Sequence, residues 1–196
     1  IRLSLVGSEM CIRDSPQTLR EVLRDGRPQI QDETIEWHNK QINGPERHHR
    51  YQSAMYAVTT DYNRFLRQSQ DLQGRALRIA IEHWRRRRPR TMGTLIWQLN
   101  DCWPVISWSL VDYKLRPKAA WYQVRRAYAP VTTFLAGKEI PEIWSVNDSN
   151  QLYAGQIAVS AWNLEGEMLQ EKFIEVEVKA GTTLQIKDID IAGWLS

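Results

Sequence analysis

The sequence has few cysteines and no long apolar run. Its 196 residues include two cysteines, Cys11 and Cys102, whereas a disulfide framework or a thiolate metal site needs more of them. No stretch approaches the roughly 20 consecutive apolar residues that a membrane-spanning helix requires. We therefore expect neither a disulfide-rich scaffold nor a metal site, and no membrane partner for this stretch of chain.

Arginine is missing from the last third of the chain. Residues 131–196 contain four lysines, no arginine and ten acidic residues, whereas residues 1–130 contain 22 basic and 13 acidic residues. A composition break of this kind at Pro130 indicates a domain boundary. The basic first part has its arginines dispersed along predicted helices and no recognised binding motif, so we expect no nucleic-acid partner.

Apolar residues at helical spacing predict a long amphipathic helix over residues 61–88. Asp61 is placed to cap its start and Pro89 ends it. Gly74 in its middle predicts a kink or a close packing contact, because glycine weakens a helix unless its size is needed. The arginines of residues 85–88 are interpreted as a solvated helix end rather than a nucleic-acid patch.

Shorter signals precede this helix. Residues 16–25 and 32–37 have short helical patterns, and the Asn-Gly-Pro punctuation of residues 43–49 predicts a loop. The three histidines of the region, His38, His48 and His49, are expected to face solvent. No carboxylate or cysteine stands at metal-ligand spacing from them.

The most aromatic stretch is residues 91–131, which holds four of the nine tryptophans. Residues 94–99 are predicted to form a short buried strand, residues 102–113 a loop, and residues 117–127 a helix. Together they make a β/α unit, and in β/α barrels ligands bind at the C-terminal end of the strand. After Pro130 the apolar period changes to two, which predicts an antiparallel β-sandwich of five or six strands.

The run WQLNDCWPVISWS at residues 97–109, followed by Asp112, Tyr113 and the helix KAAWYQVRRAYAPV, resembles the last barrel strand and helix of β-mannosidases. These are glycoside hydrolases of family two, which also holds β-galactosidase and β-glucuronidase. The positions that fall in register are Trp97, Gln98, Leu99, Asn100, Asp101, Trp103, Pro104, Ser107, Trp108, Ser109, Asp112 and Tyr113. Weaker similarity runs from about Pro16 to the C-terminus.

The resemblance implies an α/β part followed by an all-β part. Residues 16–130 would be the C-terminal part of a catalytic (β/α)8 TIM barrel, and residues 131–196 an incomplete immunoglobulin-like β-sandwich. Both are shorter than the full folds, which take about 250 and about 100 residues, so we expect a fragment. Residues 1–15 resemble a translated sequencing-adapter tail and are predicted to be non-native.

Glycoside hydrolysis needs two carboxyl groups. The family uses two glutamates, and its nucleophile sits in a Ser-Glu-aromatic-Gly-x-Gln-Ser motif. Glu9 lies in the tail and lacks the glycine and glutamine of that motif, so no catalytic residue is nominated and the fragment is expected to be inactive. The expected ligand is a β-mannoside oligosaccharide or glycan, with no cofactor and no metal. The oligomeric state and the compartment are not predicted.

What remains is part of a sugar pocket. By resemblance, Trp97 forms a wall of the subsite that holds the mannose ring, because an indole face stacks on sugar C–H groups; without the resemblance, packing between strand and helices is the alternative. Asn100 and Asp101 are the other candidate substrate-binding residues, with fixing the loop as the equal alternative. Trp103 and Trp108 are expected to hold the shape of the loop.

Two other functions stay open at this point. The sandwich and the tryptophan-rich loop could bind carbohydrate without cleaving it, or the basic part could bind nucleic acid, which a steep salt dependence would reveal. Within family two, exo-β-glucosaminidase and endo-β-mannosidase activities remain alternatives for the parent protein. A barrel without most of its strands would leave strand edges open, so residues 16–130 are expected to aggregate or be partly disordered alone.

Overall fold

The computed structural model describes residues 16–23, 30, 33–137, 141–187 and 189–194. The chain forms two compact units, Ile1–Ile81 with Thr94–Ala127, and Glu82–Gly93 with Tyr128–Ser196. The predicted non-native tail lies outside the described residues, and the division at residue 130 stays a prediction. Among the described residues, no helix is long and apolar enough to cross a membrane.

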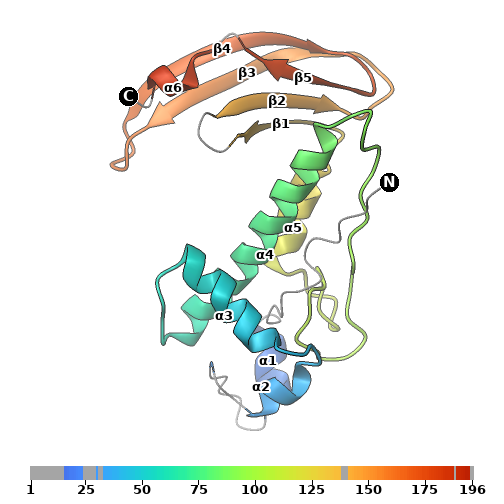
Figure 1. Ribbon diagram of the computed structural model, residues 1–196, viewed down its shortest axis with the longest axis vertical. Helices are drawn as coiled ribbons and strands as arrows, with labels where there is room; N and C mark the ends of the chain where they lie inside the picture. The colour runs from blue at the N-terminus through green and yellow to red at the C-terminus, as the bar shows by residue number, and fades with distance from the viewer. Residues whose placement is uncertain (1–15, 24–29, 31–32, 138–140, 188, 195–196) are drawn as a thin grey trace. The chain divides into compact units, whose positions relative to one another are not determined.

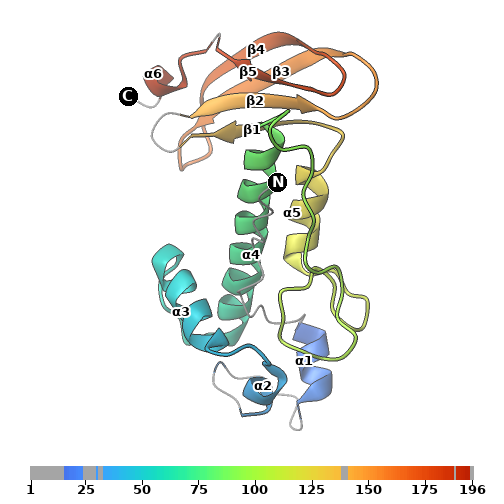
Figure 2. The ribbon, with the colours of Figure 1, turned by 45° about the vertical axis from the view of Figure 1, so that its right-hand side comes forward.

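The first unit is helical. Its elements are α1 (Pro16–Val22), α2 (Glu33–His38), α3 (Gly44–Met55), most of α4 (Tyr62–Arg85) and α5 (Ala119–Ala127). Figures 1 and 2 show α4 and α5 side by side. Their contact is a core of buried apolar residues, namely Leu77, Ile81, Leu110, Ala120, Val124 and Ala127.

The long helix begins and packs as its sequence predicts. Asp61 caps it, since its Oδ1 accepts a hydrogen bond of 2.6 Å from the Arg64 backbone N–H. A Cβ placed on Gly74 would lie 2.8 Å from Cγ of Gln123 and 3.4 Å from Cα of Ala120. The close packing contact expected at Gly74 is therefore confirmed, because a Cβ there would have to displace the Gln123 side chain.

The loop predicted for residues 43–49 is wrong. Asn43 has a left-handed φ of 56°, and α3 begins at the next residue, with Pro45 in its first turn. Proline is favoured there because its fixed φ suits the helix and its missing N–H would have no partner inside the helix. The Asn-Gly-Pro sequence thus marks the start of a helix.

The strand predicted for residues 94–99 is also not formed. The segment has no strand ladder, and Leu95, Trp97 and Leu99 are 77%, 60% and 60% exposed. A strand needs neighbours that pair with its backbone N–H and C=O groups. The described residues of the first unit supply only isolated bridges, such as that between Asn100 and Val111.

The second unit contains a small β-sandwich. Strands β1 (Val131–Ala136), β2 (Glu142–Asn147) and β5 (Thr182–Ile186) form one antiparallel sheet, in the order β1-β2-β5. Strands β3 (Tyr153–Trp162) and β4 (Met168–Val178) form the other, and a short helix, α6 (Ile191–Trp194), follows. The predicted antiparallel strands are confirmed.

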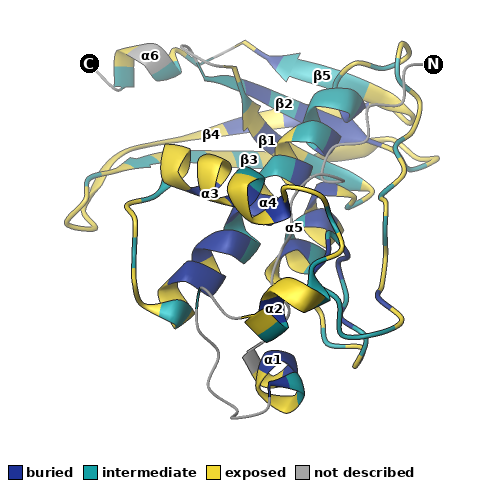
Figure 3. Cartoon of the chain, turned by 60° about the horizontal axis from the view of Figure 1, so that its bottom comes forward, coloured by how far each residue is buried: buried dark blue, intermediate teal, exposed yellow. Residues whose placement is uncertain are grey.

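The sandwich core follows the period-two pattern of its strands. Ile143 and Ile186 of one sheet pack against Ile174 and Val176 of the other. Figure 3 shows β4 buried at one end and exposed toward the hairpin, as its burial pattern records. The alternation of apolar and polar residues therefore selects which face of each strand is buried.

Arg85, the last residue of α4, is not a solvated helix end. Its side chain is 6% exposed, and its Nη2 lies 2.8 Å from Oδ2 of Asp148 and 2.8 Å from the Ala129 carbonyl oxygen. Arg88 also contacts this carboxylate, at 2.8 Å. The solvated interpretation of this run is thus wrong for Arg85, since a buried guanidinium needs such partners.

The α4–α5 core predicts a sharp contrast between two isoleucines of one helix. Ile81 is fully buried and Ile79 is 59% exposed. Ile81→Ala should lower the free energy of unfolding by about 2–5 kcal/mol, because it leaves a cavity, whereas Ile79→Ala should change it by less than about 0.5 kcal/mol. Urea unfolding followed by circular dichroism measures both; equal losses would mean that this core is wrongly described.

Candidate functional site

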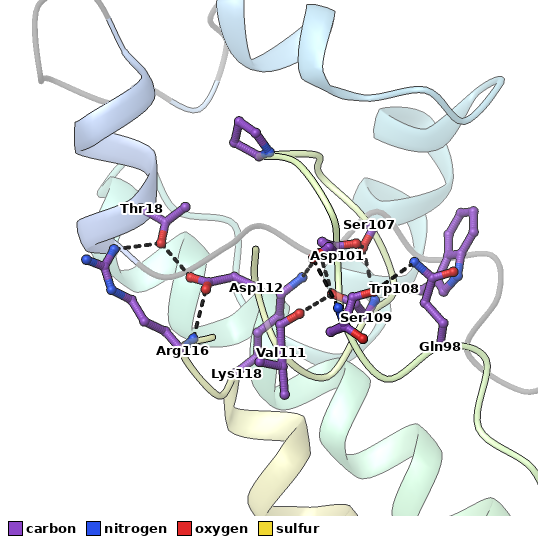
Figure 4. Close-up of polar contacts among 12 residues, drawn as sticks. Thr18, Gln98, Asp101, Ser107, Trp108, Ser109, Val111, Asp112, Arg116 and Lys118 are labelled. Carbon is purple, nitrogen blue, oxygen red and sulfur yellow. Dashed lines mark hydrogen bonds and ion pairs between the residues drawn. The ribbon is translucent and has the colours of Figure 1, made fainter. Parts of the chain in front are cut away.

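The loop between residues 100 and 118 folds around the carboxylate of Asp101. This side chain is buried and accepts hydrogen bonds from the hydroxyls of Ser107, at 2.7 Å, and Ser109. Lys118, directly before α5, places its ammonium 3.4 Å from Oδ2 of Asp101, and both side chains are fully buried. Figure 4 shows these groups converging on the carboxylate. The charge of Asp101 is therefore neutralised inside the loop.

A second buried carboxylate, Asp112, ties α1 to the same loop. Its Oδ1 accepts the backbone N–H groups of Lys114 and Arg116, each at 2.9 Å, and its Oδ2 accepts the Thr18 hydroxyl at 2.5 Å. The Arg116 guanidinium donates to Thr18 at 2.8 Å and to Glu21 at 2.7 Å (Figure 4 shows the contact with Thr18). The hydrogen bond to Glu21 raises the pKa of Arg116.

The three predicted site residues separate into two exposed and one buried. Trp97 is 60% exposed, Asn100 is exposed, and Asp101 is 3% exposed. The peptide bond between Trp97 and Gln98 is cis. Both carboxylate oxygens of Asp101 are occupied by loop partners, which fits the loop-fixing alternative. Sugar contact by Trp97 and Asn100 stays a prediction.

An aromatic cluster holds the start of the loop against α2. The His38 ring stacks on Trp103 with ring centroids 5.4 Å apart, and Trp37 meets Trp103 edge-on at 5.8 Å. His38 Nδ1 also contacts the Pro104 carbonyl oxygen, and the Lys40 ammonium lies 3.9 Å above the Trp37 ring. These contacts agree with a shape-holding role for Trp103.

Two histidines do not face solvent as expected. His38 belongs to the aromatic cluster, and His48 is 4% exposed, with its ring 5.3 Å from that of Phe65. His48 lies on α3, so the helix that replaced the predicted loop also turned this side chain inward. In the part of the chain that the structure describes, no three His, Cys, Asp or Glu residues group as metal ligands.

A cavity of about 430 Å³ in the first unit is lined by residues of α2, α3 and the loop, including Glu36, Glu46, His49 and Ile106. Carboxylates and imidazoles are common acid–base groups, and Glu36, Glu46 and His49 bring such groups to this cavity. The carboxylate oxygens of Asp101 and Asp112, by contrast, already accept hydrogen bonds from neighbouring donors.

Sequence reasoning missed Lys118 and Thr18 as partners of the loop carboxylates. Thr18 is separated from Asp112 by 94 residues, which no local pattern reveals. A signal did exist for Lys118: two acidic residues in an aromatic loop require cationic or hydroxyl partners if they are buried.

Known proteins with the same sequence pattern are β-mannosidases. Residues 140–196 match the Mannosidase Ig/CBM-like domain model. The chain is 31% identical over 190 residues to β-mannosidase B of Thermothelomyces thermophilus, covering 83% of this chain and 21% of the relative. It is 32% identical over 154 residues to β-mannosidase B of Aspergillus terreus, covering 75% and 18%.

The solved β-D-mannosidase of Dictyoglomus thermophilum matches 91% of this chain, with a TM-score of 0.84 and 32% identity. The chain belongs to the β-mannosidase family. It spans about a fifth of the length of the curated relatives it matches, and 22% of that solved chain. The exo-chitosanase of Amycolatopsis orientalis, 21% identical with a TM-score of 0.63 over 71% of this chain and 17% of its own, shares the fold.

The buried pair predicts that Asp101 matters more for stability than its exposed neighbour. Asp101→Asn leaves the fully buried Lys118 ammonium without its counter-charge and should lower the free energy of unfolding by about 3–5 kcal/mol. Asn100→Ala should lower it by less than about 0.5 kcal/mol. The double variant Asp101→Asn/Lys118→Met should recover part of the lost free energy of unfolding, as measured by urea unfolding. Equal losses for Asn100→Ala and Asp101→Asn would contradict the prediction.

Proposed function

We propose that this chain is part of a retaining β-mannosidase that removes terminal β-linked mannose from oligosaccharides or glycoproteins. The observation that carries the proposal is the 32% identity to a solved β-D-mannosidase over 91% of the chain. In this proposal residues 16–130 are the end of the catalytic (β/α)8 barrel, and residues 131–196 begin an immunoglobulin-like domain.

The conformation of residues 94–99 supports a place in a barrel. The segment forms no helix, and its apolar side chains Leu95, Trp97 and Leu99 are exposed. This is the state expected of a barrel strand whose neighbours are supplied by other parts of the protein, because apolar side chains at this density are normally covered. With those neighbours in place, Trp97 would stand at the strand's C-terminal end, where barrel enzymes bind substrate.

In the proposed mechanism the chain supplies one wall of the pocket and the rest of the protein supplies the chemistry. The Trp97 indole face stacks on the mannose C–H groups, and Asn100 offers an amide to sugar hydroxyls. A retaining glycosidase needs an acid/base and a nucleophile about 5–5.5 Å apart. Asp101 and Asp112 cannot serve, because their oxygens are held within the loop, so we expect the chain alone to be inactive.

A second candidate function is that the β-sandwich binds carbohydrate and does not cleave it. It is favoured by the match of residues 140–196 to a model described as Ig/CBM-like. The two functions are compatible, since a hydrolase can carry a binding domain beside its catalytic one.

The proposal is tested with p-nitrophenyl β-mannoside on the 196-residue chain and on a longer protein that includes the parent gene's upstream sequence. Only the longer protein should turn over. In it, Trp97→Ala should lower kcat/KM by about tenfold or more, because the sugar is less well positioned, and Met92→Ala, an exposed control, should not.

Activity of the 196-residue chain alone would contradict the assignment of both catalytic carboxylates to the rest of the protein. In that case the two glutamates of the 430 Å³ cavity, Glu36 and Glu46, become the residues to substitute next. Inactivity of the longer protein on β-mannosides would contradict the proposed substrate.

A further inference from the structure

The outer face of the β3–β4 hairpin carries exposed aromatic side chains. Ile157 and Val159 of β3 pack with Ile174 and Val176 of β4 in the sandwich core, so the residues between them point to the opposite face. Four of the opposed pairs on that face are Gln156 with Glu175, Ala158 with Phe173, Ser160 with Glu171, and Trp162 with Met168. We call these eight residues the hairpin face.

The Trp162 side chain is tied to this face through its ring nitrogen. Its indole N–H donates a hydrogen bond of 2.8 Å to the Ser160 hydroxyl, two residues back on the same side of the strand. The pairing register shifts between Ala161 and Trp162, which leaves Leu169 of β4 without an opposite residue. Because the polar edge of the indole already has a partner and the side chain is 58% exposed, its faces are presented for an apolar contact.

Phe173 adds a second ring on the same face. It is 56% exposed and lies opposite the small residue Ala158. Positions 158 and 162 are four residues apart, about 13–14 Å along the strand, and the indole leans back toward Ser160 within that span. Ser160 and Glu171 lie between the two rings, over a span whose length suits a short oligosaccharide.

The charges of the hairpin face favour a neutral, hydroxyl-rich ligand. Two of the four residue pairs contain a glutamate, Glu171 or Glu175. The Gln156 side-chain amide donates a hydrogen bond of 2.7 Å to Glu175. None of the eight residues is basic, so a nucleic acid or an anionic membrane would be repelled. A protein partner would have to bury the carboxylates without their water, whereas sugar hydroxyls can donate hydrogen bonds to them in place.

We propose that the hairpin face binds a neutral oligosaccharide, with Trp162 and Phe173 stacking on sugar rings and Glu171 accepting hydroxyl hydrogen bonds. The choice of a β-linked mannose chain as the ligand rests on the function proposed above. The surface is distinct from the candidate pocket in its residues, because the second unit holds none of Trp97, Asn100 and Asp101.

The test is calorimetric titration of the 196-residue chain with β-1,4-mannopentaose. Trp162→Ala and Phe173→Ala should each weaken binding roughly tenfold, because each removes one stacked ring. Ser160→Ala removes only the hydroxyl that holds the indole and should weaken binding severalfold. Leu164→Ala, in the fully exposed turn between the strands, is the matched control and should bind unchanged.

The titration also separates this proposal from the proposed function. Loss of binding in Trp97→Ala with full binding in Trp162→Ala would place the ligand in the first unit and overturn the hairpin-face site. Absence of binding by the unaltered chain would overturn it too, while the turnover assay on the longer protein still decides the β-mannosidase function. Thermal unfolding of each variant checks that it is folded. If Trp162→Ala or Phe173→Ala unfolds at a lower temperature than the unaltered chain, the affinity of Ser160→Ala decides the test.

Discussion

The Asp101–Lys118 pair is the interaction on which the aromatic loop depends. Two opposite charges without solvent exposure are stable only as a pair, since either one alone would carry a large desolvation cost. The pair joins the beginning of the loop to the residue before α5, and the hydroxyls of Ser107 and Ser109 complete the shell of the carboxylate. Trp97 and Asn100 remain exposed beside a loop whose two buried carboxylates already have partners.

Local sequence patterns correctly predicted the helices and strands whose hydrogen-bonding and packing partners lie in the same unit. The period-two strands after residue 130 find partners within the second unit, and the Asp61 cap needs only the Arg64 backbone N–H. The partners of Gly74 lie on α5, but a glycine inside a helix itself indicates that some neighbour comes close. Residues 94–99 fail as a strand for the opposite reason: their apolar pattern describes an environment that the described part of the first unit does not contain.

The sequence placed the candidate site residues Trp97, Asn100 and Asp101 next to one another but did not reveal their surroundings. Only the structure shows that Asp101 is buried among Ser107, Ser109 and Lys118. The contact between Thr18 and Asp112 spans 94 residues and has no local signal. The prediction for Asn43-Gly44-Pro45 was wrong for a different reason. The same residue types occur both in loops and at the start of helices, so the sequence alone does not distinguish the two.

The burial of Arg85 against Asp148 has a consequence for how such domains can be exchanged in evolution. The second unit is assembled from two separate stretches of sequence, Glu82–Gly93 and Tyr128–Ser196, and both Arg85 and Arg88 on the first stretch meet Asp148 on the second. A single recombination break near residue 130 would carry the acidic partner away from both arginines. Residues 131–196 are therefore not sufficient to transfer this sandwich to another protein. A gene fusion must either include the end of α4 or replace Asp148 by a residue that needs no cationic partner.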